Sequence, residues 1–236
     1  MKRFYKTVTA EPRDGGWGVL LDGRPIKTVA GSSQIVPSRA LAEALAQEWA
    51  DQGEELDPRA FVLRDMADYA ADVVATDRAA VIRGLLAFAG TDTLCYRAEP
   101  EEPLAEKQDA VWEPLLHAAE RRWDIHFERV AGIIHQAQPA ATLARLEAVL
   151  AAESDYSLAA LNTLASLAAS LVIALAAIQP GADADALSDA ANLEEDWQVE
   201  LWGKDAEAQA LRERRLAAFA AAMRFARLAG EEPITR

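Results

Sequence analysis

The pattern of hydrophobic and polar positions changes once along the chain, and its first part predicts β-strands. β-branched and aromatic residues are concentrated from Arg3 to Thr9, and an apolar stretch runs from Trp17 to Leu21. The Asp-Gly pair at positions 22–23 separates this stretch from Arg24 to Thr28, and Asp-Gly between two such runs is typical of a two-residue hairpin turn. We therefore predict a strand, a hairpin and a further short strand from Gln34 to Val36.

From Ser38 onward, the apolar positions recur with the spacing of an α-helix. Leu41, Leu45 and Trp49 are four residues apart, which places them on one face, and Ser38 can cap the first turn. Most of the remaining chain has helical patterns. The predicted helices are Arg64–Ala75, Asp77–Ala89, Leu104–Trp123 with a break or new start at Pro114, Ala140–Ala152, Ser157–Ile178, Ala184–Trp202 and Asp205–Ala229, and Ile125–Val130 is a candidate isolated strand.

Together these elements predict an α+β fold. A small N-terminal β-rich or α+β domain, residues 1–60, is expected to precede a larger all-helical domain, residues 61–236. The change in pattern places the boundary between residues 53 and 92. A chain of 236 residues is long enough to form one large domain or two small ones, and in both cases it can bury a hydrophobic core.

The apolar segment from Leu158 to Ile178 is long enough to cross a bilayer. Alanine makes up much of it, however, and Asn162 and Ser166 are among the polar residues that interrupt it. Its flanks carry acids, such as Asp155, where a membrane helix usually has Lys or Arg. We therefore predict a buried core helix with no membrane insertion, and keep a membrane span as the alternative.

Charge and cysteine content narrow the classes of partner. A formal net charge of -14 opposes binding to nucleic acid and to anionic membrane surfaces, and favours basic partners instead. The single cysteine, Cys95, cannot form an internal disulfide, which is typical of a protein from a reducing compartment. The basic start, Met1 to Lys6, is not followed by the apolar run of a secretory signal, so none is expected.

No catalytic or cofactor-binding motif is recognisable. His117, His126 and His135 are nine residues apart, which does not place two of them on one helical turn, as many zinc sites require. Cys95 has no second cysteine to form a CxxC pair, and the chain contains neither a phosphate-binding loop nor a nucleophile elbow. We therefore expect no metal and no cofactor, and favour a binding protein over an enzyme.

The segment from Glu194 to Gly203 combines three consecutive acids with two tryptophans. Trp197 and Trp202 are five residues apart, whereas core positions of a helix recur every three or four. Tryptophan often anchors interfaces because it removes a large area from water. Two interpretations stay open: a tryptophan meets a partner, or both lie in the core and the acids only cover the solvated face.

Several short blocks, spread in a fixed order over nearly the whole chain, resemble one known family. They are Lys2–Lys6, Leu21–Thr28, Glu48-Trp49, Thr91–Arg97, Gln108 with Trp112–Leu116, and Glu194–Gln198 with Trp202-Gly203. In order and spacing they are similar to the alpha-subunit assembly chaperones of the F-type ATP synthase. The chain departs from the family at Val29, where a proline more often follows the Lys-Thr pair, and this difference affects only a loop.

The resemblance implies a non-catalytic chaperone. Members of this family bind the unassembled alpha subunit of the catalytic sector and shield its partner-facing surface until the beta subunit replaces them. They combine a small α+β domain with a larger helical one. The resemblance implies the bacterial cytoplasm, or the mitochondrial matrix for eukaryotic relatives. The alanine-rich sequence, in which we expect no transit arm, favours the bacterial cytoplasm for this chain, and we expect a monomer.

The resemblance also assigns roles to individual residues. An acidic position associated with chaperone function aligns best with Glu195. The density of acids beside the two tryptophans, together with this alignment, motivates a client-binding set as a hypothesis, and the blocks quoted above give a set of structural family positions. The client-binding set is Glu194, Glu195, Asp196, Trp197 and Trp202, and the structural set is Trp49, Asp92 and Arg97.

Two rival interpretations remain. One is an enzyme with an unrecognised polar site at the domain junction, built from Asp92, Tyr96 and Arg97; a deep polar pocket with perturbed carboxylates would favour it. The other is a helical adaptor for another basic protein, which the acidic composition would also suit.

Overall fold

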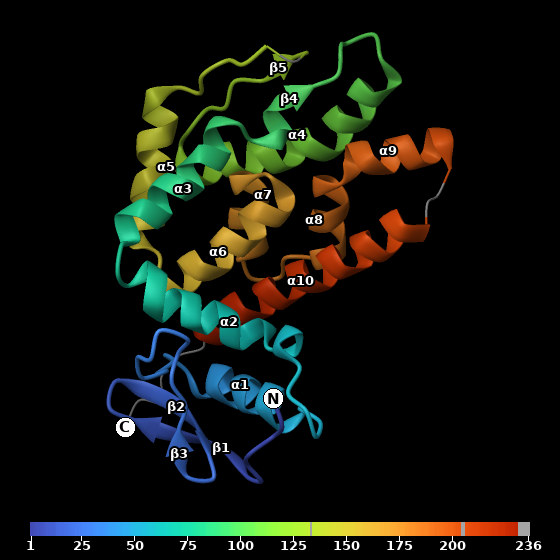
Figure 1. Ribbon diagram of the computed structural model, residues 1–236. Coiled ribbons are helices and arrows are strands. Elements are labelled where there is room, and N and C mark those ends of the chain that lie inside the picture. Colours follow the sequence, from blue (N-terminus) through green and yellow to red (C-terminus); the bar gives the residue numbers. More distant parts are fainter. Residues whose placement is uncertain (133, 204–205, 231–236) are drawn as a thin grey trace. The chain divides into compact units, whose positions relative to one another are not determined.

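The computed structural model describes residues 1–132, 134–203 and 206–230 (Figure 1). As predicted, the fold is α+β: a small sheet lies in the N-terminal part and helices make up most of the remainder. Contacts within the chain divide it into two units. Unit 1 contains Met1–Arg78, Ser154–Ala160 and the described part of Ala221–Arg236, and unit 2 contains Ala79–Glu153 and Leu161–Ala220. The predicted boundary between residues 53 and 92 stays a prediction, because these units are defined by contacts alone.

The sheet of unit 1 has three antiparallel strands in the order β1-β2-β3. They span Val8–Arg13, Gly16–Leu21 and Arg24–Pro25. The Asp-Gly pair at positions 22–23 turns the chain between β2 and β3, and both residues have positive φ, as this turn requires. The predicted hairpin is therefore confirmed.

The first strand begins later than the sequence pattern indicated, because the preceding residues bond elsewhere. The backbone N–H of Arg3 donates to the carbonyl of Glu54 at 2.8 Å. The N–H groups of Lys6 and Thr7 donate to the carboxylate of Asp22 at 3.0 and 2.8 Å. These contacts replace the strand ladder that β-propensity alone predicted.

The strand predicted at positions 34–36 is reduced to a single antiparallel bridge between Trp17 and Val36. The two residues exchange backbone hydrogen bonds of 2.9 and 2.8 Å. The bridge brings the backbone so close that a Cβ atom at Gly16 would lie 2.3 Å from the Val36 carbonyl oxygen. A glycine is therefore required at position 16.

Helix α1, Arg39–Ala50, packs against β1 and β2 with the face that its sequence predicted. Leu41 and Leu45 are fully buried, and Trp49 is 9% exposed. The Ser38 side chain accepts a hydrogen bond from the N–H of Leu41 at 3.0 Å, which confirms the predicted cap.

After a short 3₁₀ helix, Pro58–Ala60, the next α-helix of unit 1 is α2, Val62–Tyr69, which continues as a π-helical turn, Ala70–Val74. Its free N–H groups are satisfied from outside the helix: those of Leu63 and Arg64 donate to the Glu48 carboxylate at 2.7 and 2.9 Å. A carboxylate in this position also favours the positive end of the helix dipole. The two elements together occupy the region predicted as one helix.

The remaining elements belong wholly or mainly to unit 2. They are α3 (Arg78–Gly90), a 3₁₀ helix (Thr93–Cys95), β4 (Tyr96–Arg97), α4 (Pro103–Trp123), β5 (Val130–Ala131), α5 (Ala140–Ala152), α6 (Asp155–Ala168), α7 (Leu171–Ala177), α8 (Ala184–Ala191), α9 (Leu193–Trp202) and α10 (Ala206–Gly230). Contrary to prediction, α4 passes through Pro114 without a break. The candidate strand at 125–130 is wrong in its extent, since β5 begins at Val130 and pairs in parallel with β4. Asp205, the predicted start of the last helix, lies outside the described residues.

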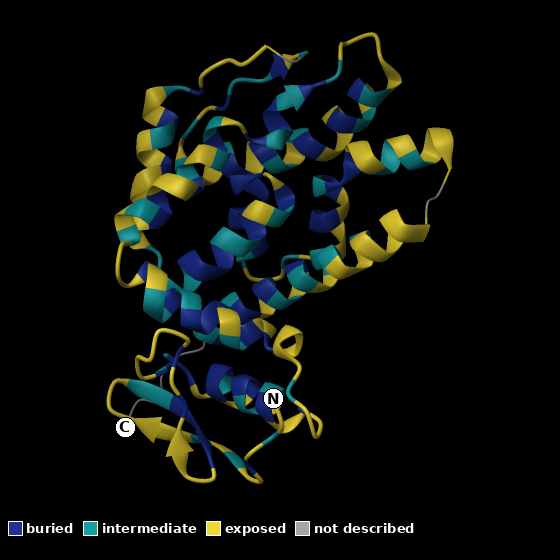
Figure 2. Cartoon of the chain, viewed as in Figure 1, coloured by how far each residue is buried: buried dark blue, intermediate teal, exposed yellow. Residues whose placement is uncertain are grey.

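The long helix predicted at 157–178 is two helices, α6 and α7. Ala169 has a left-handed φ of 48°, which ends α6. Ser170 then caps α7 by accepting a hydrogen bond from the N–H of Ile173 at 3.0 Å. Figure 2 shows α7 almost wholly buried, as the core prediction required. None of the described helices is both long enough and apolar enough to span a membrane.

A second predicted helix, at 184–202, is also divided, into α8 and α9. Asn192 leaves helical geometry at the junction, with φ of -105° and ψ of 15°. Its side-chain amide donates to the carbonyl of Ser188 at 2.6 Å, which ends α8. The chain therefore changes direction just before the acidic residues of α9.

The break at Ala169 gives a test of backbone strain. Left-handed geometry costs an L-residue about 1–2 kcal/mol of folded-state stability. Glycine avoids this cost, but its greater backbone freedom stabilises the unfolded chain, which offsets part of the gain. We expect Ala169→Gly to raise the unfolding free energy by about 0.5–1 kcal/mol in urea denaturation. Ala165→Gly, inside α6, should lower it by at least about 1 kcal/mol. A loss of stability in the first variant would contradict the assigned strain.

Candidate functional site

Helix α9 carries the stretch of acids and tryptophans that the sequence singled out. It begins at the buried Leu193 and packs against α4. Glu194, Glu195 and Asp196 occupy its first turn, where negative side chains stabilise the positive end of the helix dipole. Figure 1 shows α9 in orange, between α4 and the first turns of α10.

Helix α4 contacts α9 through two neighbouring polar side chains. The amide of Gln108, which is fully buried, donates to Glu194 Oε1 at 2.7 Å. The ammonium group of Lys107 pairs with Glu200 and lies 4.4 Å from the ring centroid of Trp197. Trp197 is therefore half-buried beneath a cation and does not project freely into solvent.

Helix α10 contacts the same helix through two arginines. Arg212 pairs with Asp196, and its second terminal nitrogen donates to Asp189 of α8 at 2.7 Å. Arg215 pairs with Glu195 at 3.2 Å. Each of these partly exposed pairs contributes less than about 1 kcal/mol. Jointly they fix α9 relative to α8 and α10, so all three predicted client-binding acids are already bonded within unit 2.

The exposed apolar side chains lie at the other end of α9. Trp202 is 78% exposed and Leu201 is 55% exposed, and Leu211 on α10 is 51% exposed. The interpretation that both tryptophans lie in the core is therefore wrong for Trp202. Figure 2 shows exposed residues over much of α9 and the first turns of α10.

Between α9 and α10 lies a groove of about 730 Å³, which we call the α9–α10 groove. Apolar side chains from both helices line it, among them Val199 and Trp202 of α9 and Leu211 and Leu216 of α10. Two of the ion pairs described above, Glu195–Arg215 and Asp196–Arg212, also line it. Its volume lies within the usual range for sites that accept apolar ligands or side chains.

Asp92, a predicted structural position, is fully buried next to the start of α7. Its carboxylate accepts hydrogen bonds from the N–H groups of Leu94 at 3.1 Å and Val172 at 3.0 Å. Burial raises the pKa of Asp92 to about 6, and these hydrogen bonds oppose the shift. The carboxylate thus caps two helical elements and is not open to solvent.

Arg97 is also occupied within unit 2. Its guanidinium group donates to Glu113 at 2.7 Å and to Asp109 at 3.2 Å, and its central carbon lies 5.2 Å from the ring centroid of Trp112. Burial lowers the pKa of Arg97, while the two carboxylates oppose that shift. Asp92 and Arg97 therefore hold the structure together, which removes the main support for an active site made from them.

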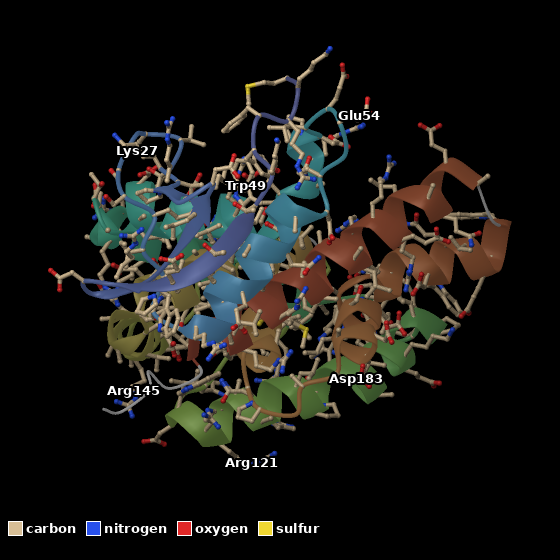
Figure 3. All side chains as sticks on the ribbon, turned by 90° about the horizontal axis from the view of Figure 1, so that it is seen from below. Lys27, Trp49, Glu54, Arg121, Arg145 and Asp183 are labelled. Atoms are coloured by element: carbon tan, nitrogen blue, oxygen red, sulfur yellow. The ribbon has the colours of Figure 1, made fainter. Side chains whose placement is uncertain are left out.

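Trp49 packs in unit 1 near the end of α1, where Figure 3 labels it. Its ring centroid lies 4.5 Å from that of Phe61 and 5.6 Å from that of Tyr5. The Tyr5 hydroxyl donates to the backbone carbonyl of Trp49 at 2.6 Å. This aromatic cluster gives Trp49 a packing role.

The candidate reactive residues have ordinary surroundings. Cys95 is fully buried, and burial raises the pKa of its thiol, which disfavours the nucleophilic thiolate. His117 lies 3.1 Å from Glu120, and His135 shares a hydrogen bond of 3.0 Å with the Tyr96 hydroxyl. Within the described residues, no three His, Cys, Asp or Glu side chains are grouped as a metal site.

Sequence reasoning missed the cations that hold α9. Lys107, Arg212 and Arg215 were not predicted, although all three pair with its acids. One signal was present: three arginines lie between Leu211 and Leu216 in a chain with a net charge of -14. Such a local excess of positive charge favours an internal acidic partner.

The chain is similar in sequence and fold to several known proteins. A family model described as ATP12 chaperone protein matches residues 2–120. The mitochondrial protein atp12 of Schizosaccharomyces pombe is 26% identical over 215 residues, which cover 86% of this chain and 74% of that protein. The crystal structure of Atp12 from Paracoccus denitrificans is 36% identical, with a TM-score of 0.91 over 97% of this chain and 98% of that one. A structure from Agrobacterium tumefaciens is 37% identical, with a TM-score of 0.91 over 96% and 85% of the two chains.

Proposed function

Because the chain belongs to the ATP12 chaperone family, we propose that it assists assembly of the F-type ATP synthase by binding the unassembled alpha subunit. The observation that carries this proposal is the agreement in sequence and fold with Atp12 over nearly the whole chain. The order of the sequence blocks supports the same client. The protein acts by binding and not by catalysis.

Mass action explains how such a protein works without fuel. An orphaned subunit exposes an apolar surface that normally meets its partner, and this surface promotes self-association. A chaperone that covers the surface lowers the free concentration of the aggregating form. The beta subunit displaces the chaperone if it binds better at an overlapping site.

We place this activity in the cytoplasm of a bacterium, and in the mitochondrial matrix for eukaryotic relatives. The mitochondrial relative from fission yeast and the bacterial structures support both assignments. The net charge of -14 suits a basic client surface, because opposite charge accelerates encounter. Nucleic acid is not an expected partner.

We assign α9 as the element that serves the client. Its exposed Trp202 provides an apolar anchor, and its first-turn acids, Glu194 to Asp196, support it. Trp197 stabilises the same helix from beneath Lys107. Trp49, Asp92 and Arg97 serve the fold.

The purified chain should be mixed with the alpha and beta subunits separately. We expect a stable complex with alpha on size-exclusion chromatography, less light scattering from alpha on dilution out of denaturant, and neither effect with beta. Addition of beta should then release the chaperone. Failure of a folded sample to capture alpha would contradict the proposal.

A further inference from the structure

We propose that the α9–α10 groove binds an amphipathic helix of the client with basic residues beside its apolar face, and that the acids of α9 hold the groove in shape without touching the client. This inference rests on the proposed function. It assigns a docking surface and the chemistry of its occupant, and it makes Glu195 and Asp196 positioning residues.

The apolar part of the groove is open and lined by large side chains. Trp202 and Leu211, from opposite walls, are 78% and 51% exposed, and Val199 and Leu216 lie deeper between them. Burying such side chains is favourable by about 25 cal/mol per Å² of apolar area removed from water. A tryptophan at the mouth of a groove is a typical hot spot for protein binding.

The charge around the groove selects a basic occupant. Among the residues that the structure describes, three acids, Glu195, Asp196 and Glu213, and two arginines, Arg212 and Arg215, line it. Both arginines are bonded within the chain, and Arg212 also binds a fourth acid outside the lining. The charge balance of these described residues is therefore negative.

Glu213 is the acid best placed to meet a cation of the client. It is exposed and accepts a hydrogen bond of 3.3 Å from the neutral amide of Gln209. Within the described residues, no cationic group lies at ion-pair distance from Glu213. A Lys or Arg of the occupant would satisfy it.

Two helices that diverge around a groove accept a third helix by ridge-into-groove packing. Such an occupant inserts apolar side chains at i, i+3 or i+4 and i+7, and keeps its charged residues at the rim. A second copy of this chain is disfavoured, since each carries a net charge of -14 and the two repel. An amphipathic, basic helix of the client satisfies both the apolar wall and the negative rim.

The bonding of the acids indicates positioning. Glu195 pairs with Arg215, and the other terminal nitrogen of Arg215 donates to the carbonyl of Leu167 in α6 at 2.9 Å. One arginine thus connects α6, α9 and α10. The Glu195 carboxylate therefore already has a cationic partner within the chain.

A charge swap tests whether Glu195 positions α9 through Arg215 or contacts the client directly. We expect Glu195→Arg and Arg215→Glu to weaken alpha-subunit binding by about tenfold each, because each places like charges together. The double variant restores the internal ion pair but not the bond to the Leu167 carbonyl, because a carboxylate at position 215 cannot donate it, so affinity should recover in part and exceed that of either single variant. A double variant no tighter than Glu195→Arg alone would contradict the positioning role of the pair.

The groove itself is tested with a matched pair of apolar variants. Trp202→Ala should weaken alpha-subunit binding by at least about tenfold, whereas Leu201→Ala, also exposed but outside the groove lining, should change it by less than about threefold. Ala208→Trp, which fills the groove, should act like Trp202→Ala. Circular dichroism melting confirms that each variant is folded.

The outcomes distinguish this inference from the proposed function. If wild type binds the alpha subunit and both groove variants bind it equally well, the groove assignment is wrong while the function stands. If folded wild type binds no alpha subunit, the function fails first. A dimer that forms in wild type and is lost in Trp202→Ala on analytical ultracentrifugation would identify a second copy as the occupant and overturn the proposal.

Glu213→Lys should weaken alpha-subunit binding and reduce the dependence of that binding on salt concentration.

Discussion

Asp92→Ala is expected to lower the unfolding free energy by about 3–5 kcal/mol at pH 7. The carboxylate accepts hydrogen bonds from the backbone N–H groups of Leu94, Leu171 and Val172 and from the Ser170 hydroxyl, all in a fully buried place. Alanine would leave these donors without an acceptor, and each unsatisfied buried group costs about 1–3 kcal/mol. Urea denaturation followed by circular dichroism measures the loss.

Two variants serve as controls for that result. Asp92→Asn keeps one acceptor oxygen in place, so its loss should be smaller than that of Asp92→Ala. Glu147→Ala removes an exposed carboxylate from α5 and should change the unfolding free energy by less than about 0.5 kcal/mol. If Asp92→Ala were as stable as Glu147→Ala, the capping role would be refuted.

The same residue makes stability depend on pH in a predictable direction. Burial raises the pKa of Asp92 from 3.8 to about 6, so the folded protein binds this proton more tightly than the unfolded chain does. The contribution of this tighter proton binding to the free energy of unfolding is complete below pH 3.8 and is lost as the pH rises through about 6. The free energy of unfolding of wild type, minus that of Asp92→Asn, should therefore be about 1 kcal/mol larger at pH 5 than at pH 7. The opposite sign would contradict the assigned shift.

Local signals in the sequence predicted the elements that depend on neighbouring residues. The Asp-Gly turn between β2 and β3 requires only its own backbone geometry, and Ser38 caps α1 through a bond three residues away. Leu41 and Leu45 follow from helical spacing alone. For these elements, the information is contained within a few residues.

The breaks in the long helices could not be predicted in this way. Alanine and leucine around Ala169 favour an unbroken helix. The break is stabilised from far along the chain: both the N–H and the hydroxyl of Thr93 donate to the carbonyl of Ala169, and Asp92 accepts from Val172. Tertiary contacts of this kind override helix propensity.

The candidate site shows the same limit. The sequence identified the acids of α9 and the unusual spacing of its tryptophans, but not which groups they meet. Glu194 bonds to Gln108, 86 residues away, and Glu195 pairs with Arg215, 20 residues away. Only the fold reveals that these acids are bonded internally, and that Trp202 is left exposed beside a groove.

The second large effect is expected at Trp112, which supports α8 and hence the start of α9. Its side chain is fully buried in α4, and its indole N–H donates to the carbonyl of Ala190 at 2.8 Å. Replacement by alanine removes this bond and leaves a large cavity, so we expect Trp112→Ala to lose about 3–5 kcal/mol of unfolding free energy. Urea denaturation measures the loss, and Val111→Ala on the same helix, 39% exposed, should lose less than about 1 kcal/mol.

Because Ala190 lies just before the junction of α8 and α9, the Trp112→Ala variant should also loosen α9 within the folded state. Hydrogen exchange at the amides of α8 and α9 should accelerate more than exchange at those of α1, whose cap and apolar face do not involve Trp112. Alpha-subunit binding should weaken in the same variant under conditions where it remains folded, since the α9–α10 groove depends on the position of α9. Uniform acceleration across all helices, with unchanged binding, would mean that Trp112 stabilises only the core and has no particular connection to the groove.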